Sequence, residues 1–305
     1  MDLALTKPFV LLDGGTGQEL ILRSAAGAKP LWSAQVLMDE PDLVTAVHRD
    51  FIEAGADVIT LNTYSATPRR LWRNGLPDIT AELHRAAIDA ANRARSEAGR
   101  PVQLAGCLPP LVASYRPELA PPRAEARAEF AALVALQAPD VDLFIIETMT
   151  SIAEAVAATE AAVDSGKPAW TAVSVDDRDG TLLRSGEPIT DAFTAIEEAG
   201  AVAVLVNCSS PEAVGAGLRH VLTSARQQRL PIGGYANGFV SVDALEPGVT
   251  VDVLETRIDL GPEAYAEHAT GWIEAGARII GGCCAVGPAH IAALARLRAE
   301  VMQAA

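Results

Sequence analysis

The sequence predicts one α/β domain over residues 1–305, a (β/α)8 barrel of the TIM type. Three observations predict it: eight short apolar runs, Ala-rich amphipathic segments between them, and a recurring Glu-Ala-Gly-Ala joint. Eight β/α units in this length fit the fold, which typically needs roughly 250 residues plus insertions. A doubly wound open sheet is the alternative. It is the weaker interpretation because Gly14, Gly15 and Gly17, after the first run, do not have G-x-G-x-x-G spacing.

Each apolar run is rich in Val, Ile and Leu and lacks a clean alternation of apolar and polar residues. Parallel strands that are covered on both faces have this pattern. The predicted strands cover residues 9–15, 57–63, 102–107, 143–148, 169–175, 201–208, 231–237 and 277–283. The amphipathic helical segments include residues 42–54, 80–98, 123–138, 151–165 and 288–303.

The Glu-Ala-Gly-Ala joint occurs three times, each time directly before a predicted strand. Its copies are residues 53–56, 198–201 and 274–277. A glycine at this point suits a left-handed helix C-cap that is followed by a turn into the sheet. We therefore expect Gly55, Gly200 and Gly276 to end helices.

Two segments interrupt the repeat. Residues 108–122 are Pro-rich and follow the third strand, and residues 238–262 follow the seventh strand without a clear period. Both segments follow the C-terminal ends of strands, where the active-site loops of a barrel grow. Surface decoration without a function is the other interpretation of both.

The charge of the chain is strongly negative, with 24 Lys and Arg residues against 39 Asp and Glu residues and a formal net charge of −15. Nucleic acids and anionic membranes require a basic face, so this charge argues against both as partners and accommodates a small cationic substrate. The chain has no basic leader region, and no uncharged apolar run reaches the roughly 20 residues of a membrane span. The sequence therefore predicts a cytoplasmic enzyme whose four cysteines are reduced.

Polar residues and cysteines stand at the C-terminal ends of the predicted strands, where barrel enzymes place functional side chains. These ends carry Asp13, Asn62, Thr63, Cys107, Glu147, Asn207, Cys208, Asn237, Cys283 and Cys284. One polar residue at a strand end is a weak signal, because polar residues end apolar runs by default. Three cysteines on strands six and eight are a stronger one, since these strands lie near each other around a barrel.

Cys208 can approach Cys283 and Cys284 in this fold. Adjacent residues of a regular strand point to opposite faces, so Cys283 and Cys284 can share one ion only where the backbone leaves strand geometry. Gly281 and Gly282 permit such a departure. Three thiolates arranged in this way make a tetrahedral zinc site with one open position. Three inert buried cysteines are the alternative.

A zinc ion with three thiolates carries a net charge of −1, which makes it a poor activator of water. Such a centre suits a fourth thiolate, supplied by a substrate, because a zinc-coordinated thiol is deprotonated whereas a free thiol with a pKa of about 8.5 is mostly protonated. The expected reaction is attack of the substrate thiolate on an electrophilic carbon. The nucleophile is then the substrate, and we expect no catalytic protein side chain.

Four motifs carry a resemblance to a known family: LLDGGTGQEL (11–20), ITLNTYSAT (59–67), VNCSSPEAV (206–214) and IIGGCCAVGPAHI (279–291). They resemble the zinc-dependent homocysteine S-methyltransferases. This family includes the S-methylmethionine- and betaine-dependent enzymes and the homocysteine domain of cobalamin-dependent methionine synthase. The resemblance runs from about residue 9 to residue 299, with the motifs in the family order, and it implies a (β/α)8 barrel.

The resemblance also implies the roles of individual residues. It makes Cys208, Cys283 and Cys284 the zinc ligands and Asn237 a weaker, displaceable fourth ligand through its carbonyl oxygen. It assigns Asp13 and Glu147 to the amino group of homocysteine, a sensible role because two carboxylates at one barrel mouth repel each other unless a cation lies between them.

Some assignments near the expected site are less specific. The backbone near Gly14 and the side chains of Asn62 and Thr63 are candidates for the substrate carboxylate. Cys107 ends the third strand but is not part of the family motif. Five aromatic residues could form a cage for a cationic donor or simply pack: Trp32, Tyr64, Trp72, Tyr115 and Tyr235.

The predicted function is zinc-dependent methyl transfer from an onium donor to the thiolate of homocysteine, which yields methionine. S-methylmethionine is the first choice of donor and betaine the second. Three alternatives stay open: a methyltransferase component that takes its methyl group from a separate corrinoid protein, an enzyme for another thiol acceptor, and a protein with structural zinc. Structural zinc normally has four protein ligands, which counts against the last alternative. The sequence predicts no oligomeric state.

Overall fold

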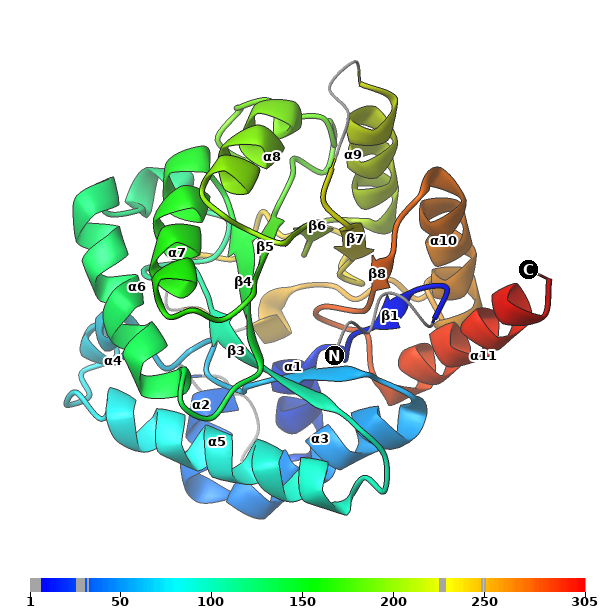
Figure 1. Ribbon diagram of the computed structural model, residues 1–305. Helices are drawn as coiled ribbons and strands as arrows, with labels where there is room; N and C mark the ends of the chain where they lie inside the picture. The colour runs from blue at the N-terminus through cyan, green and yellow to red at the C-terminus, as the bar shows by residue number, and fades with distance from the viewer. Residues whose placement is uncertain are drawn as a thin grey trace.

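Eight parallel strands lie at the centre of the molecule, with the helices around them (Figure 1). The computed structural model describes residues 7–25, 31, 33–224, 229–247, 249 and 251–304. The strands are β1 (Val10–Leu11), β2 (Val58–Thr60), β3 (Gln103–Leu108), β4 (Leu143–Met149), β5 (Ala169–Val173), β6 (Ala203–Asn207), β7 (Ile232–Tyr235) and β8 (Ile279–Ile280). All eight predicted strands are confirmed, each within or close to its expected range.

Helices follow every strand. They are α1 (Thr16–Arg23), α2 (Ser33–Asp39), α3 (Pro41–Ala54), α4 (Pro68–Arg73), α5 (Thr80–Glu97), α6 (Arg123–Gln137), α7 (Ile152–Asp164), α8 (Ile189–Glu198), α9 (Pro211–Thr223), α10 (Pro262–Ala275) and α11 (Pro288–Ala304), with short 3-10 helices η2 (Pro117–Leu119) and η3 (Val251–Val253). No helix within the described ranges has the length and apolar composition that crossing a membrane requires.

The strand order is β1-β8-β7-β6-β5-β4-β3-β2. Between β1 and β2 the barrel is closed by one isolated bridge, Leu12 with Val58, and by two backbone hydrogen bonds. In these bonds the N–H of Asp57 donates to the carbonyl oxygen of Leu11 at 2.7 Å, and the N–H of Asp13 donates to that of Val58 at 3.1 Å. The predicted (β/α)8 barrel is confirmed.

The strands are buried on both faces, as their apolar runs predict. In β4, Leu143 and Ile145 belong to a cluster inside the barrel, while Phe144 and Ile146 belong to the larger cluster between the sheet and the helices. Because successive side chains of a strand alternate between faces, both sets must be apolar. The missing in/out alternation in the sequence therefore has a direct physical cause.

The three predicted glycine joints are confirmed. Gly55, Gly200 and Gly276 have φ angles of 115°, 98° and 120°, which L residues rarely adopt. The N–H of Gly55 donates to the carbonyl oxygen of Ile52, and that of Gly276 to the carbonyl oxygen of Ile273. These bonds end α3 and α10 and turn the chain into the following strand.

The loop of residues 238–262 has its own apolar cluster. Its described core residues are Phe239, Val242, Leu245, Val251 and Leu254, and Tyr115, Cys284 and Ala285 pack against them. Residues 248 and 250 lie outside the described residues. The loop therefore packs onto the C-terminal end of the barrel, against residues that follow β3 and β8.

The joint before β2 yields a stability prediction. A Cβ atom added at Gly55 would lie 2.8 Å from the Cβ of Ala295, whereas one added at Gly99, which also has a positive φ (62°), would meet no atom within 4 Å. We expect Gly55→Ala to lower the free energy of unfolding by about 3 kcal/mol and the control Gly99→Ala by about 1 kcal/mol. Urea unfolding followed by tryptophan fluorescence measures both. Equal losses would contradict the steric argument.

Candidate functional site

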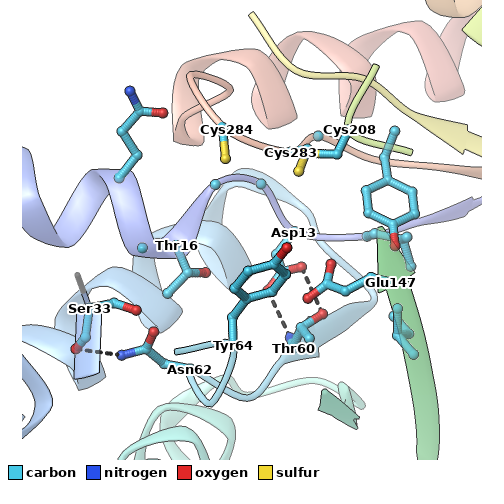
Figure 2. Close-up of a pocket in the computed structure, with 18 of the residues that line it drawn as sticks. Asp13, Thr16, Ser33, Thr60, Asn62, Tyr64, Glu147, Cys208, Cys283 and Cys284 are labelled. Carbon is cyan, nitrogen blue, oxygen red and sulfur yellow. Dashed lines mark hydrogen bonds between the residues drawn. The ribbon is translucent and has the colours of Figure 1, made fainter. Parts of the chain in front are cut away.

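A cavity opens at the C-terminal ends of the strands (Figure 2). Residues from or just after β1, β2, β4, β6, β7 and β8 line it, together with residues of the loop after β3. Five residues predicted for the site contribute polar atoms to the lining: Asp13, Glu147, Cys208, Cys283 and Cys284. Asn62 and Gly14 also line it. The barrel thus brings most of the predicted site residues to one place.

The three predicted metal-ligating cysteines form a cluster. The sulfur atoms of Cys208, Cys283 and Cys284 all lie within 4.8 Å of one another. Cys208 is buried and the other two are half-buried, so one side of the cluster faces the cavity. Three thiols at this spacing can bind one soft or borderline metal ion and leave a coordination position open toward the cavity.

The cluster distributes its negative charge unevenly. Hydrogen bonds from the thiols of Cys283 and Cys284 lower the pKa of Cys208 well below its ordinary value. The same bonds with Cys208 raise the pKa of Cys283 and of Cys284. A single thiolate held by two neighbouring thiols has a ready place for a cation, since a bound cation stabilises all three sulfurs in their ionised form.

The backbone leaves strand geometry at Gly281 and Gly282, before the adjacent cysteines, as expected. The strand β8 ends at Ile280, and neither Gly281 nor Gly282 has a positive φ. A Cβ atom at Gly281 would lie 2.6 Å from the Cβ of Leu12, and one at Gly282 would lie 2.1 Å from Val286 Cγ1. Close packing therefore requires glycine at both positions.

Strained backbone surrounds the cavity. Among the described residues, the non-glycine positions with positive φ are Tyr115 (62°), Thr148 (62°), Cys208 (50°) and Ala285 (62°). Tyr115 and Cys208 line the cavity, Thr148 follows the lining residue Glu147, and Ala285 follows Cys284. Such conformations persist only where the surrounding structure fixes them, and they cluster at functional sites.

Asp13 and Glu147 are the two carboxylates of the cavity. The N–H of Thr60 donates to Asp13 Oδ2 at 2.7 Å, and the Thr60 hydroxyl donates to Oδ1 at 3.2 Å. Burial, together with the nearby Glu147 carboxylate, raises the pKa of Asp13 to about 7. Burial also raises the pKa of Glu147 to about 7. Two acids that are hard to ionise side by side would both be stabilised by an ammonium group between them.

Cys107 contacts Glu147 of this acid pair and is not part of the cysteine cluster. Its thiol donates a hydrogen bond to Glu147 Oε1 at 3.0 Å. Cys107 is buried, and its backbone N–H is bound by the side chain of Gln137 at 2.9 Å. The thiol therefore holds one oxygen of the Glu147 carboxylate from outside the cavity.

Three other predicted site residues differ in their placement. Asn62 lines the cavity and donates a hydrogen bond to the backbone oxygen of Ser33 at 3.2 Å. Thr63 is buried but is not part of the lining. Asn237 is buried beside the cysteine segments, where its Oδ1 accepts from the N–H of Phe239 at 3.1 Å. The carbonyl oxygen of Ala236 accepts from the N–H of Cys283, and the N–H of Gly238 donates to the carbonyl oxygen of Cys284.

The sequence analysis missed Thr60 and Gln18. Thr60 fixes Asp13, and the Gln18 side chain accepts from the backbone N–H of Ala285, next to the cysteine pair. Both residues lie within the family motifs, at 59–67 and 11–20, and this position could have identified them. Of the aromatic cage candidates, Tyr64, Tyr115 and Tyr235 line the cavity, Trp72 is 82% exposed, and Trp32 lies outside the described residues.

A protein-family model described as homocysteine S-methyltransferase matches residues 10–298. The chain belongs to this family. Similar proteins include a homocysteine S-methyltransferase of Escherichia coli, 31% identical over 93% of this chain and 94% of that protein, and homocysteine S-methyltransferase 4 of Zea mays, 30% identical over 94% and 88%. A selenocysteine Se-methyltransferase of Brassica oleracea is 30% identical over 95% and 88%. The predicted family, and with it the prediction of a methyltransferase, are confirmed.

The fold of this homocysteine S-methyltransferase family member is close to a solved one. The metallated form of the homocysteine methyltransferase MmuM from Escherichia coli superposes with a TM-score of 0.78 and 29% identity, covering 95% of this chain and 97% of that one. In this chain the three clustered sulfurs supply the donors that a metal needs. The site can therefore hold a metal ion.

The cluster geometry predicts which cysteine a metal needs. Cys208→Ala removes one of three converging sulfurs, so we expect stoichiometric metal binding to be lost, while the barrel keeps its fold because the residue follows β6 at the loop end. Cys107→Ala is the matched control, since it removes the one cysteine outside the cluster. Zinc content after dialysis and circular dichroism measure both effects. Stoichiometric zinc in the Cys208 variant would exclude this ligand set.

Proposed function

We propose that the chain, as one homocysteine-binding domain over residues 1–305, transfers a methyl group from an onium donor to homocysteine and forms methionine. The observation that carries this proposal is the layout of one cavity. Three clustered sulfurs lie in the same lining as two carboxylates with raised pKa values. Homocysteine carries the complementary groups, a thiol and an ammonium group. The cytoplasmic location stays a prediction.

The acceptor is oriented by the chain's own residues. Asp13, held by Thr60, and Glu147, held by Cys107, would bind the ammonium group. The backbone N–H of Gly14 donates to no atom of the described residues, and Asn62 uses only one of its two amide donors there. Both are therefore suited to the substrate carboxylate. Thr63, which is buried outside the lining, is the weaker candidate for the same role.

The metal in this proposal is zinc, with Cys208, Cys283 and Cys284 as ligands. When bound, zinc supplies the charge that keeps an acceptor thiol deprotonated near neutral pH, where a free thiol is mostly protonated. Asn237 is the weaker, displaceable ligand: its Oδ1 accepts from Phe239 but keeps a second lone pair. Anchoring the acceptor at both ends aligns its sulfur with the methyl carbon, which is the main contribution we expect from the protein.

The transfer itself needs no protein nucleophile. The acceptor sulfur attacks the methyl carbon in line, and the sulfur or nitrogen of the donor leaves with the bonding electrons. A cationic donor suits the negative charge of the chain and the tyrosine rings that line the cavity. S-methylmethionine is the first choice and betaine the second.

A parallel assay tests the proposal and names the donor. Zinc-loaded protein and homocysteine are incubated with S-methylmethionine, S-adenosylmethionine, betaine or dimethylsulfoniopropionate, and methionine is quantified. We expect turnover with one or more donors, S-methylmethionine foremost. The absence of methionine with all four, in protein with stoichiometric zinc, would favour a separate corrinoid protein as the methyl source.

A second acceptor is supported by one comparison. The similarity to a selenocysteine Se-methyltransferase, at 30% identity over 95% of this chain, makes a selenol acceptor the specific form of the alternative acceptor. The same assay with selenocysteine in place of homocysteine decides between the two acceptors through their ratio of kcat/KM.

The raised pKa values of the acid pair predict a pH-dependent affinity for the acceptor. Below pH 7 burial keeps Asp13 and Glu147 largely protonated, and a neutral acid binds an ammonium group poorly. The affinity should therefore rise about ten-fold between pH 6 and pH 8 for each acid that must ionise. Inhibition by L-norleucine, an amino acid without a thiol, isolates this effect from thiol ionisation. A flat pH profile would contradict it.

Glu147→Gln tests the same assignment at constant pH. Loss of one carboxylate should raise the KM for homocysteine about 10- to 100-fold, since charge-assisted hydrogen bonds are lost. Zinc binding should stay within two-fold of the wild type, because Glu147 lies outside the cluster. An unchanged KM would remove Glu147 from the site.

A further inference from the structure

The backbone at Cys208 is held in an unfavourable conformation. Its φ of 50° places this L residue in the left-handed region, one residue after the end of β6. Its sulfur lies within 4.8 Å of the sulfurs of the other two cysteines. A conformation of this kind needs contacts that hold it, and these contacts come from the loops after β3 and β5.

The loop after β5 contacts the Cys208 segment through Arg184. The guanidinium donates from Nε to Ser174 Oγ at 2.7 Å, and the Ser174 hydroxyl lies 3.4 Å from the carbonyl oxygen of Cys208. Arg184 also pairs with Asp177 at 2.9 Å, and the other oxygen of that carboxylate accepts from the N–H of Ser210 at 2.7 Å. Two chains of hydrogen bonds thus join one arginine to the backbone on both sides of Ser209.

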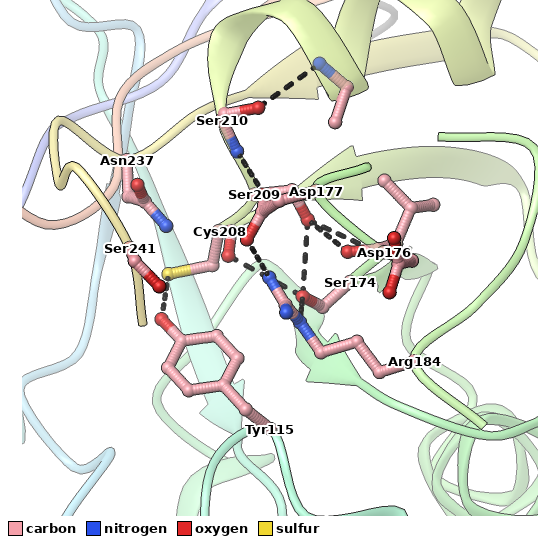
Figure 3. A network of polar contacts seen from close by, with 12 residues as sticks. Tyr115, Ser174, Asp176, Asp177, Arg184, Cys208, Ser209, Ser210, Asn237 and Ser241 are labelled. Atoms are coloured by element: carbon pink, nitrogen blue, oxygen red, sulfur yellow. Dashed lines mark hydrogen bonds and ion pairs between the residues drawn. The ribbon is translucent and has the colours of Figure 1, made fainter. Parts of the chain in front are cut away.

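The loop after β3 contacts the sulfur itself. The hydroxyl of Tyr115 lies 3.0 Å from Cys208 Sγ (Figure 3). The guanidinium of Arg184 lies 4.7 Å from the centre of the Tyr115 ring, within the range of a cation–π interaction. Arg184 therefore supports Cys208 twice, once through the backbone and once through the aromatic ring that holds the sulfur.

We infer that Tyr115 and Arg184 are positioning residues for the metal thiolate of Cys208. This inference rests on the proposed function, in which Cys208 is a metal ligand. A metal-bound cysteine has no S–H, so the Tyr115 hydroxyl must be the donor and the sulfur the acceptor. The bond fixes the direction of the sulfur and withdraws part of its negative charge from a centre that carries three thiolates. Partners of this kind orient metal ligands and tune the metal.

The hydroxyl and the ring have separable parts in this arrangement. The ring packs against the apolar cluster of the 238–262 loop and against Arg184, and both contacts survive in a phenylalanine. Within the described residues, the hydroxyl of Tyr115 forms a hydrogen bond only with Cys208. A purely structural tyrosine would lose little metal affinity on removal of that oxygen.

Metal affinity and metal spectroscopy test the inference without an activity assay. Tyr115→Phe, Arg184→Met and the control Arg178→Met are compared with the wild type. Arg178 lies in the same loop as Arg184 and is a matched control because its side chain is 89% exposed. Zinc affinity is measured by chelator competition, and the thiolate-to-metal charge-transfer band is recorded for the cobalt-substituted proteins.

We expect Tyr115→Phe to weaken zinc binding about 10- to 100-fold and to shift the charge-transfer band. Arg184→Met should have the same two effects, and Arg178→Met should match the wild type. In the variant with both Tyr115→Phe and Arg184→Met, the fold-loss of zinc affinity should be smaller than the product of the two single fold-losses. Thermal unfolding of the metal-free proteins checks the fold, and Tyr115→Phe decides if Arg184→Met fails to fold. If Tyr115→Phe keeps the zinc affinity and the cobalt spectrum of the wild type, this inference is overturned while the proposed metal site stands. Stoichiometric zinc in Cys208→Ala would overturn the proposed metal site as well.

Discussion

The position of the cysteine pair depends on a close approach between the two ends of the barrel sequence. A Cβ atom at Gly15 would lie 2.6 Å from the carbonyl oxygen of Cys283, and one at Gly14 would lie 2.1 Å from that of Val286. The segment with these glycines begins at Asp13, whose carbonyl oxygen accepts from the N–H of Gly282 at 3.0 Å. One backbone contact therefore sets both the sulfur positions and the distance from the sulfurs to an acid.

The cavity brings together three sulfurs and two carboxylates, whose negative charges repel one another when they ionise. Burial raises the pKa of both carboxylates to about 7, and the negative charge of Cys208 adds to this effect for Glu147. Cations relieve this conflict at two points, a metal at the sulfurs and an ammonium group at the acids. In the proposed function, an acceptor with both an amino group and a thiol occupies both points.

The sequence predicts the features that depend on neighbouring residues along the chain. The eight strands follow from apolar runs, and the helix ends at Gly55, Gly200 and Gly276 follow from a repeated joint. The family and the cysteine cluster follow from motifs. The contact of Tyr115 with Cys208 could not be predicted, because it depends on left-handed backbone at both residues and on the packing of the loop after β3. The steric reason for Gly281 could not be predicted either, because a sequence pattern does not show that a Cβ atom there would lie 2.6 Å from the Cβ of Leu12.

The order of the ligands along the chain has a consequence for biosynthesis. Cys208 follows the sixth strand, while Cys283 and Cys284 follow the eighth. A nascent chain that has emerged only through its seventh strand has one thiol of the three, and the barrel still lacks the strand that pairs with β1. In the proposed metal site, binding of the ion by all three sulfurs therefore accompanies closure of the barrel.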